Sequence, residues 1–403
     1  MKNTLAELEN WGADVIFGRA RGFRAGLTRL AMSVLSVGFF GIVRARLAIF
    51  RKRWIQQTHL GTHVISIGNL TVGGTGKTPV TEMLARELQH RQRRVAILSR
   101  GYKSHRLPET QTWHDETKHK IDAHQMPKVV SDGTRILLDS KYAGDEPYML
   151  AKNLDGVSVV VDRDRIKGGR FAVEHLNADI LLLDDGLQYL RLAHGTDIVL
   201  IDRNAPYGTG HLLPRGTLRE PPRNLIRASY ILITKCDGSS NAELIEQIRR
   251  HNKFAPIIEC THGPRYLEEL FTGRQEPLDY LQDKWVAAIS GIAVPEGFER
   301  SLDKLGARVE IKRRFPDHYR FTQKEIDHFM NRCLERDMEM VVTTEKDAVR
   351  FPQPTEVTVP IWFLRIEVEI INGHDAWEDM LDRICYPHAP GDPILRYQTD
   401  YLC

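Results

Sequence analysis

The chain has 403 residues, of which 42% are hydrophobic and 27% charged, the composition of an ordinary globular protein long enough for two domains. Its net charge of only +3 gives no general attraction to polyanions, so we expect no nucleic-acid partner. The five cysteines are scattered, odd in number and without metal-ligand spacing, so we interpret them as reduced thiols. The N-terminus lacks an early apolar core with a small-residue cleavage site, and we therefore predict no secretory signal.

The N-terminal segment is the compositional anomaly of the chain. Residues 30–43 carry no charge, and arginines and aromatic side chains flank them on both sides. This uncharged stretch is shorter than the about 20 residues that a spanning helix needs, so it favours a helix at a membrane surface. A core helix whose arginines extend to water is the alternative. We predict that residues 1–58 form an amphipathic segment that associates with a membrane.

A glycine-rich connection after residue 67 predicts a phosphate-binding loop. Val64 to Ile67 has the profile of a buried strand, and the apolar side chains at residues 80–88 follow helical spacing. The connection ends with the nucleotide-binding candidates Gly73, Gly74, Thr75, Gly76, Lys77 and Thr78. Glycines let several backbone N–H groups point at one anion, and the helix N-terminus adds partial positive charge. In this interpretation Lys77 reaches the terminal phosphates of a nucleotide, and the Thr78 hydroxyl binds Mg²⁺.

The loop departs from the usual P-loop pattern at one position, because Thr71 stands where the first glycine is expected. Gly68 and Gly73 flank that position and can supply the turn. A glycine-rich connection with a surface lysine is the alternative interpretation. The combination of a strand, Gly-Lys-Thr and an amphipathic helix favours the phosphate site.

Strand and helix patterns then alternate along the chain. Short apolar runs predict strands at residues 95–99, 158–161, 179–183, 198–201 and 230–233. The alternation predicts an α/β domain at residues 59–262 with a doubly wound, mostly parallel sheet. Polar residues with glycine and proline predict a linker at residues 263–282. Further alternation predicts a smaller α/β domain at residues 283–386, and residues 387–403 form a tail without an assigned function.

Acidic side chains stand at the ends of several predicted elements. Asp184 and Asp185 follow a buried strand, where P-loop enzymes hold Mg²⁺, and an Asp-Gly turn is the alternative. Asp145 precedes a helical pattern, a position typical of a helix cap or first-turn charge and compatible with a general base. Arg219 and Glu220 lie in a loop, where they could meet phosphate and metal or form a surface ion pair.

Two other stretches bear on function. Residues 234–237, Thr-Lys-Cys-Asp, resemble the guanine-reading Asn-Lys-x-Asp of GTPases. The Asp-x-x-Gly switch of GTPases is missing, because Leu183 stands three residues before Gly186. Residues 312–321 are basic and aromatic and would suit an anionic substrate, although the histidine among them, His318, is by itself more often structural.

Taken together, these stretches resemble the tetraacyldisaccharide 4'-kinase family, the lipid A 4'-kinases. The matching stretches are residues 66–79, 98–102, 144–147, 184–188, 191–192, 212–220, 317–318 and 344–347. The resemblance implies a P-loop NTPase fold with a second, smaller α/β domain and an N-terminal membrane-associating helix. It also implies transfer of the γ-phosphate of ATP to the 4'-hydroxyl of a tetraacyl glucosamine disaccharide 1-phosphate. This reaction belongs to lipid A biosynthesis at the cytoplasmic face of the inner membrane.

The resemblance also implies residue roles that the pattern alone left open. Asp145 matches the catalytic base of the family and His318 its partner, while Lys77 keeps its P-loop role. The residues expected near Mg²⁺ are Thr78, Asp184, Asp185 and Glu220. Arg219 and Lys346 resemble further cations of the active site.

The chain departs from the family pattern in places. Tyr189 stands where the family often has histidine, and Ala293 where it has glycine, which bears on substrate contacts rather than on the reaction. Two other functions use the same motifs. One is a membrane-surface GTPase or nucleotide switch that reads guanine with residues 234–237, and the other is a P-loop kinase for a different phosphorylated sugar or small metabolite.

Overall fold

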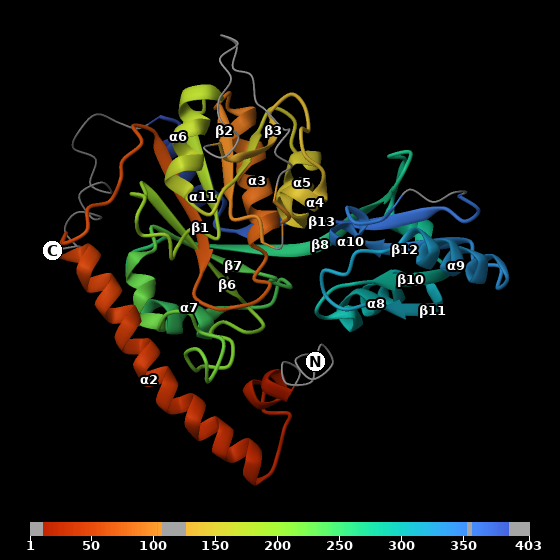
Figure 1. Cartoon of the computed structure of the whole chain (residues 1–403), viewed down its shortest axis with the longest axis horizontal. Coiled ribbons are helices and arrows are strands. Elements are labelled where there is room, and N and C mark those ends of the chain that lie inside the picture. Colours follow the sequence, from red (N-terminus) through yellow and green to blue (C-terminus); the bar gives the residue numbers. More distant parts are fainter. Residues whose placement is uncertain (1–10, 103, 107–125, 353–356, 387–403) are drawn as a thin grey trace. The chain divides into compact units, whose positions relative to one another are not determined.

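The computed structural model describes residues 11–102, 104–106, 126–352 and 357–386 (Figure 1). The chain divides into two compact units. Unit 1 comprises residues 1–100, 156–261 and 369–403, and unit 2 comprises residues 101–155 and 262–368. The division differs from the predicted boundaries at 59–262 and 283–386, because residues 101–155 group with the second half and the C-terminal helix with the first.

Unit 1 is built on a parallel sheet with the strand order β8-β7-β6-β1-β5-β2-β4. Its strands are β1 (His63–Asn69), β2 (Val95–Ser99), β4 (Ser158–Val161), β5 (Ile180–Asp184), β6 (Thr196–Asp202), β7 (Tyr230–Thr234) and the first part of β8 (Ile257–Glu269). Its helices after the N-terminal segment are α3 (Lys77–His90), α6 (Arg165–His175), α7 (Ala242–Arg249) and α11 (His374–Cys385). The predicted strands are confirmed, and the chain is an α/β protein with a large, mostly parallel sheet.

The central strands of unit 1 are buried because their sequences are almost entirely apolar. Ile65 and Ile67 of β1 and Leu181 to Leu183 of β5 are 0% exposed. Strands covered on both faces have such continuous apolar runs rather than an alternating pattern. The carboxyl ends of parallel neighbours lie at one edge of the sheet, so β1, β5 and β7 place the loops that follow them close together.

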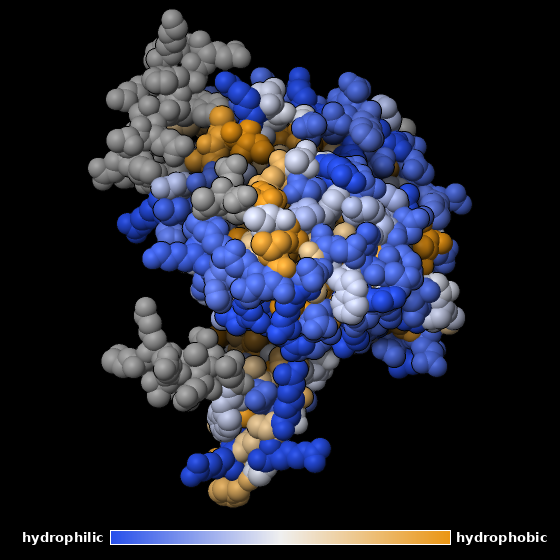
Figure 2. Space-filling view, turned by 90° about the vertical axis from the view of Figure 1, so that its right-hand side faces the viewer, coloured by the Kyte–Doolittle hydropathy of each residue, from blue (hydrophilic) through white to orange (hydrophobic). Residues whose placement is uncertain are grey.

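The N-terminal segment contains one long helix, α2 (Phe23–Arg51), which is longer than its uncharged stretch suggested. Ala25 is its one buried residue, and the apolar side chains of Leu30, Val34 and Val37 are more than half exposed. The alternative of a buried core helix is therefore wrong. By length and composition α2 is able to cross a membrane. Figure 2 shows hydrophobic residues exposed on the projecting part of this helix, beside strongly hydrophilic ones.

Unit 2 contains a second set of parallel strands, in the order β11-β10-β12-β13. These strands are β10 (Trp285–Ser290), β11 (Arg308–Arg314), β12 (Met340–Thr344) and β13 (Ile361–Asn372). The other elements are β3 (Lys128–Asp132), α4 (Ser140–Ala143), α5 (Asp145–Asn153), α8 (Pro295–Lys304), α9 (Gln323–Leu334) and α10 (Glu345–Ala348). The segment at residues 263–282, predicted as a linker, contains regular structure. The end of β8, the antiparallel β9 (Gln275–Glu276) and the short helix η2 (Leu278–Leu281) occupy it.

Gly68 fixes the approach of two loops at the end of β1. A Cβ atom at this position would lie 2.5 Å from the Leu187 Cβ and 2.9 Å from the Leu187 nitrogen. The backbone that enters the predicted phosphate loop therefore packs directly on the loop that follows β5. Only a residue without a side chain permits this contact.

Gly68→Ala is therefore expected to lower the stability of unit 1 by about 1–3 kcal/mol, the usual cost of overpacking a close contact. The matched control is Gly41→Ala in α2, where no atom lies within 4 Å of the added Cβ. Thermal unfolding in detergent should show a lower Tm for the first variant and no loss for the second. Equal Tm values for both variants and the wild type would contradict the close contact.

Candidate active site

The predicted phosphate loop has the expected context in unit 1. It runs from the end of β1 to α3, which begins at Lys77 after Gly76 in the left-handed conformation (φ 82°). The buried Asn69 amide donates to the Thr75 hydroxyl (2.9 Å), and its oxygen accepts from Lys77 Nζ (3.3 Å). The same amide donates to the Thr71 hydroxyl (3.3 Å). Thr71 is thus buried beneath the loop with a partner, and its backbone is not in the left-handed region that would favour glycine.

Asp185 is the carboxylate that faces this loop. Both of its oxygens accept from Arg219 Nη1 (2.9 and 2.8 Å), and Lys77 Nζ lies 3.6 Å from Oδ1. Burial by itself would raise the pKa of the Asp185 carboxyl, but the charges of Lys77 and Arg219 outweigh it and lower the pKa. Asp185 therefore stays ionised, in a left-handed backbone conformation (φ 57°) directly after β5.

Glu220 lies at the other side of the same loop cluster and is almost fully buried. It accepts hydrogen bonds from Gln188 Nε2 (3.2 Å), Asn224 Nδ2 (2.7 Å) and Arg227 Nη2 (2.7 Å). Gln188 in turn accepts from Arg219 Nη1 (3.3 Å). The alternative of a surface ion pair between Arg219 and Glu220 is therefore wrong, because each has a different charged partner within the site.

The carboxylates do not form a preassembled metal cage. Within the described ranges, no three Asp, Glu, His or Cys side chains come close enough together to hold a metal ion. Mg²⁺ needs no such cage, since one or two carboxylates commonly hold it together with the phosphates of a nucleotide. Asp185 lies 3.6 Å from Lys77 of the phosphate loop and is therefore the carboxylate placed to share such a site with nucleotide phosphates.

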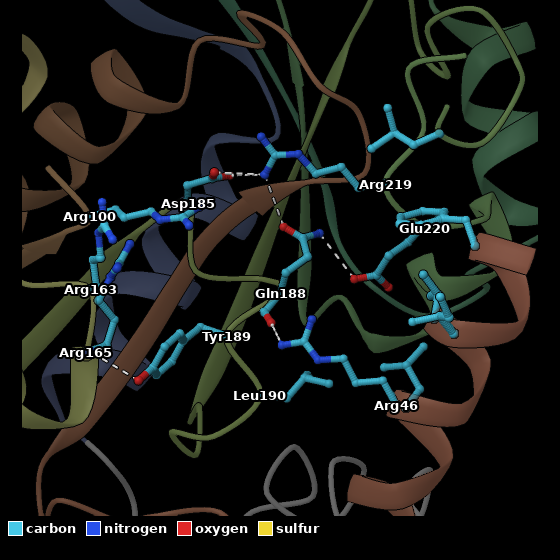
Figure 3. A pocket seen from close by; sticks show the side chains of 15 residues that line it. Arg46, Arg100, Arg163, Arg165, Asp185, Gln188, Tyr189, Leu190, Arg219 and Glu220 are labelled. Carbon is cyan, nitrogen blue, oxygen red and sulfur yellow. Dashed lines mark hydrogen bonds and ion pairs between the residues drawn. The ribbon is translucent and has the colours of Figure 1, made fainter. Parts of the chain in front are cut away.

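A cavity of about 570 Å³ adjoins this cluster within unit 1. Five arginines line this cavity: Arg46, Arg100, Arg163, Arg165 and Arg219. Figure 3 shows Arg100, Arg163 and Arg165 grouped on the side of Asp185. Helix α2 contributes apolar side chains to the same cavity, namely Phe39, Ile42, Val43 and Leu47. A positive wall next to an apolar one suits a ligand that carries both negative charge and hydrocarbon.

Tyr189 explains one departure from the family pattern. Its hydroxyl donates to Asp164 Oδ1 (2.9 Å) and accepts from the Arg165 backbone nitrogen (3.1 Å). Asp164 also caps α6 by accepting from the Ile166 nitrogen. The tyrosine therefore holds the start of α6, and with it Arg165, at the edge of the cavity (Figure 3).

A second cluster of functional side chains lies within unit 2. Asp145 is the first residue of α5, and Gly144 occupies the N-cap position, so Asp145 is a first-turn charge rather than a cap. His318 Nδ1 lies 2.8 Å from Asp145 Oδ2, and Lys346 Nζ lies 3.2 Å from His318 Nε2. Because an ammonium group only donates, Nε2 must accept. The proton of neutral His318 is then on Nδ1, from which it is donated to Asp145.

Two arginines complete this cluster. Arg350 Nε lies 3.5 Å from Asp145 Oδ2 and Arg320 Nη2 lies 3.6 Å from Oδ1. Burial opposes ionisation of Asp145, but the hydrogen bond with His318 and the charge of Arg350 outweigh it and hold the pKa of the carboxyl below its ordinary value. Arg350 is itself buried and bonded to Asp347 (2.7 Å), which keeps its guanidinium in place.

Comparisons with known proteins identify the family of the chain. The family model of the tetraacyldisaccharide-1-P 4'-kinases matches residues 28–386. The chain belongs to this family. The tetraacyldisaccharide 4'-kinase of Anaeromyxobacter dehalogenans (strain 2CP-C) is 38% identical over 375 residues, 92% of this chain and 94% of the relative. That of Syntrophus aciditrophicus (strain SB) is 36% identical over 351 residues, 85% of this chain and 89% of the relative.

A solved structure of the family is similar as well. The crystal structure of LpxK from Aquifex aeolicus in complex with ATP has a TM-score of 0.69 and 29% identity, and the match covers 89% of this chain and 100% of that chain. As a member of the tetraacyldisaccharide 4'-kinases, the chain is an ATP-dependent kinase of lipid A biosynthesis. The resemblance first drawn from scattered sequence stretches is therefore confirmed.

The structure brings the predicted site residues of this 4'-kinase into two groups. Lys77, Asp185 and Arg219 are in direct contact in unit 1, and Asp145 with His318 and Lys346 forms the group in unit 2. That the two groups act on one substrate stays a prediction. The sequence interpretation gave no role to Gln188 and Arg350, because each works through a partner far away along the chain. It also gave none to Asn69, which bonds to side chains within the phosphate loop, or to Arg163, which lines the cavity.

Proposed function

We propose that this 4'-kinase transfers the γ-phosphoryl group of ATP in line to the 4'-hydroxyl of the tetraacyl disaccharide 1-phosphate, with Asp145 as the base. The observation that carries the proposal is the 2.8 Å contact between Asp145 and a His318 whose other nitrogen accepts from Lys346. This arrangement leaves an ionised carboxylate with a fixed orientation. Such a group is suited to accept the proton of an attacking hydroxyl.

The phosphate loop holds the donor side of the reaction. Backbone N–H groups at the start of α3 bind the β- and γ-phosphates, and Lys77 neutralises them. In the structure Lys77 is shared between Asn69 and Asp185, so binding of ATP exchanges the carboxylate for phosphate oxygens. When bound, Mg²⁺ supplies charge neutralisation for the transferring phosphoryl group. The residues that would hold it are Thr78, Asp184, Asp185 and Glu220.

The acceptor side has a direct proton path. The 4'-oxygen forms a bond to the γ-phosphorus while the bond to the leaving oxygen of ADP breaks, and the hydroxyl proton moves to Asp145. The hydrogen bond from His318 and the charge of Arg350 keep Asp145 deprotonated before the reaction. The contacts with His318 and Arg350 fall on Oδ2, so the proton is taken up at Oδ1, which lies 3.6 Å from Arg320 Nη2.

The cavity in unit 1 supports a lipid acceptor rather than a soluble sugar. Its arginines suit the 1-phosphate, and the apolar side chains from α2 suit acyl chains close to the sugar. We infer that α2 associates with the cytoplasmic face of the inner membrane, so the acyl chains need not leave the bilayer. A P-loop kinase for a soluble metabolite would have no use for an exposed apolar helix at its acceptor cavity.

The test of the base is Asp145→Asn, assayed with labelled ATP and the acyl disaccharide 1-phosphate, followed by location of the new phosphate. We expect a loss of kcat of at least about a hundredfold, the usual contribution of a general base, with ATP affinity unchanged. Asp155→Asn, at an exposed position of the same unit, is the matched control. Turnover like the wild type in Asp145→Asn would remove the base assignment, and phosphate at another position would refute the acceptor.

The dependence of activity on pH tests the role of His318. Asp145 must be ionised to accept a proton, so kcat/KM falls as the pH drops through the pKa of its carboxyl. In the wild type this pKa is held low. His318→Ala removes a lowering contact while burial remains, so the acid limb of the profile should move upward by about one pH unit. His328→Ala, an exposed histidine on α9, should leave the limb unchanged. If the acid limb of the pH profile lies at the same pH in His318→Ala as in the wild type, the proposal that His318 lowers the pKa of Asp145 is contradicted.

The membrane role of α2 is tested by three substitutions on its exposed apolar positions, Leu27→Gln, Leu30→Gln and Val34→Gln, which lie outside the residues that line the cavity. Loss of three apolar side chains from a lipid interface should weaken co-sedimentation with anionic vesicles at least tenfold. Phe254→Gln, an exposed apolar residue elsewhere in unit 1, is the control. Unchanged vesicle binding of the triple variant would argue against insertion of this face.

A further inference from the structure

The Thr-Lys-Cys-Asp stretch at residues 234–237 has contacts that its similarity to a guanine-reading motif does not explain. Thr234 is the last residue of β7 and is completely buried. Its hydroxyl donates to the Thr75 carbonyl (2.9 Å). Lys235 Nζ donates to the Gly74 carbonyl (2.6 Å). Both acceptors are consecutive carbonyl groups of the phosphate loop.

An anion-binding loop needs such donors on its outer side. Its N–H groups point inward at the phosphates, so several carbonyls point outward and require partners when water is excluded. The Thr75 carbonyl belongs to the peptide that carries the Gly76 N–H, immediately before α3. Fixing this carbonyl with Thr234 therefore fixes the orientation of an N–H group at the mouth of the loop.

The ammonium group of Lys235 is already bonded within the protein and is therefore not available as a phosphate ligand. Its ammonium lies 2.5 Å from Asp202 Oδ2, at the end of the neighbouring strand β6, where Asp202 and Thr234 are register partners. Its backbone has a φ of 59°, a left-handed conformation that costs energy for a residue other than glycine. The strained turn directs the side chain back along the phosphate loop, and Asp202 balances its charge.

Asp237, which would read the base in a GTPase, is occupied within its own turn. Its Oδ1 accepts from the Ser239 nitrogen (3.0 Å) and hydroxyl (2.7 Å). Its Oδ2 accepts from Arg203 Nη1 (2.9 Å), and Arg203 is anchored in addition to Asn241 (2.6 Å). The Asp237 carboxylate thus closes a turn instead of reading a base, while Lys235 of the same motif contacts the phosphate loop.

We propose that Thr234 and Lys235 are positioning residues of the phosphate loop, which act on ATP through the carbonyls of Gly74 and Thr75 and make no contact with the base. The inference rests on the proposed use of this loop for ATP. In this proposal residues 234–237, which resemble the guanine-reading motif of GTPases, support the phosphate loop instead. ATP affinity should therefore depend on Thr234 and Lys235, and base preference should not depend on Asp237.

The test uses the full-length chain in detergent, with fluorescent ATP and GTP analogues for binding and steady-state kinetics for both substrates. Lys235→Met should raise the Kd and the KM for ATP about tenfold or more, because it removes a charge-assisted hydrogen bond from a loop carbonyl. The KM for the lipid acceptor should not change. Lys235→Arg should recover part of the affinity, since a guanidinium can also donate to both partners. The isosteric Thr234→Val should weaken ATP binding in the same way.

Asp237→Asn is the matched control within the same turn, and it should leave ATP affinity and the ratio of ATP to GTP affinity unchanged. Wild-type ATP affinity in a folded Lys235→Met would overturn the inference. If that variant does not fold, unchanged affinity in a folded Thr234→Val would overturn it instead. A changed base ratio in Asp237→Asn would restore base reading. Loss of lipid phosphorylation alone would count against the proposed function, because nucleotide binding is measured separately.

Discussion

The register between β1 and its two parallel neighbours is the constraint on which the nucleotide site depends. Ile67 of β1 pairs with Asp184 of β5, and Asn69 pairs with Leu200 of β6, two residues before that strand ends. The loops that follow these strands therefore begin at the same level of the sheet. A slip of one residue would turn Asp184 and Asn69 to the opposite faces of their strands. The apolar runs that bury β1 and β5 are thus also what aligns Lys77 with Asp185.

The charged side chains around the phosphate loop have partners within unit 1 before any substrate binds. Lys77 and Arg219 share Asp185, Arg227 is bonded to Glu220, and Lys235 to Asp202. Of these carboxylates Glu220 is almost fully buried, and a buried charge without a partner is costly, so it depends on its pairing with Arg227. Binding of a polyanion can therefore proceed by exchange of partners, in which phosphate oxygens replace carboxylates around Lys77.

The sequence predicted most strands and the phosphate loop because these depend on local patterns. Continuous apolar runs such as 180–183 and a Gly-Lys-Thr after a strand have few other interpretations. The strand at the start of the polar segment 263–282 was not predicted, because the half-exposed end of β8 has polar side chains that resemble a loop. The association of residues 101–155 with residues 262–368 is a long-range contact and leaves no signal in composition.

The site residues divide in the same way. Lys77, Thr78 and Asp185 could be predicted because a local motif or a strand end marks them. His318 and Asp145 needed the family resemblance, since an isolated histidine and a first-turn acid are common in proteins. Arg350 carried no signal, because its function lies entirely in its contacts with Asp145 and Asp347. The left-handed backbone conformations of Asp185, Lys235 and His318 could not be predicted from the sequence either, although strain of this kind concentrates at functional sites.

Helix α2 is attached to the loops of the nucleotide site as well as exposed to its surroundings. The Ser36 hydroxyl donates to the Leu212 carbonyl (2.9 Å) and accepts from the Arg215 nitrogen (3.1 Å), in the loop that leads to Glu220. Arg46 donates to the Gln188 carbonyl (2.6 Å), in the loop that follows Asp185 (Figure 3). A helix held only by lipid would need no such polar anchors on its protein side. The two attachments fix the apolar wall of the cavity relative to the arginines opposite. In the proposed function, the groups that bind the acyl and phosphate ends of one acceptor are therefore held together within unit 1.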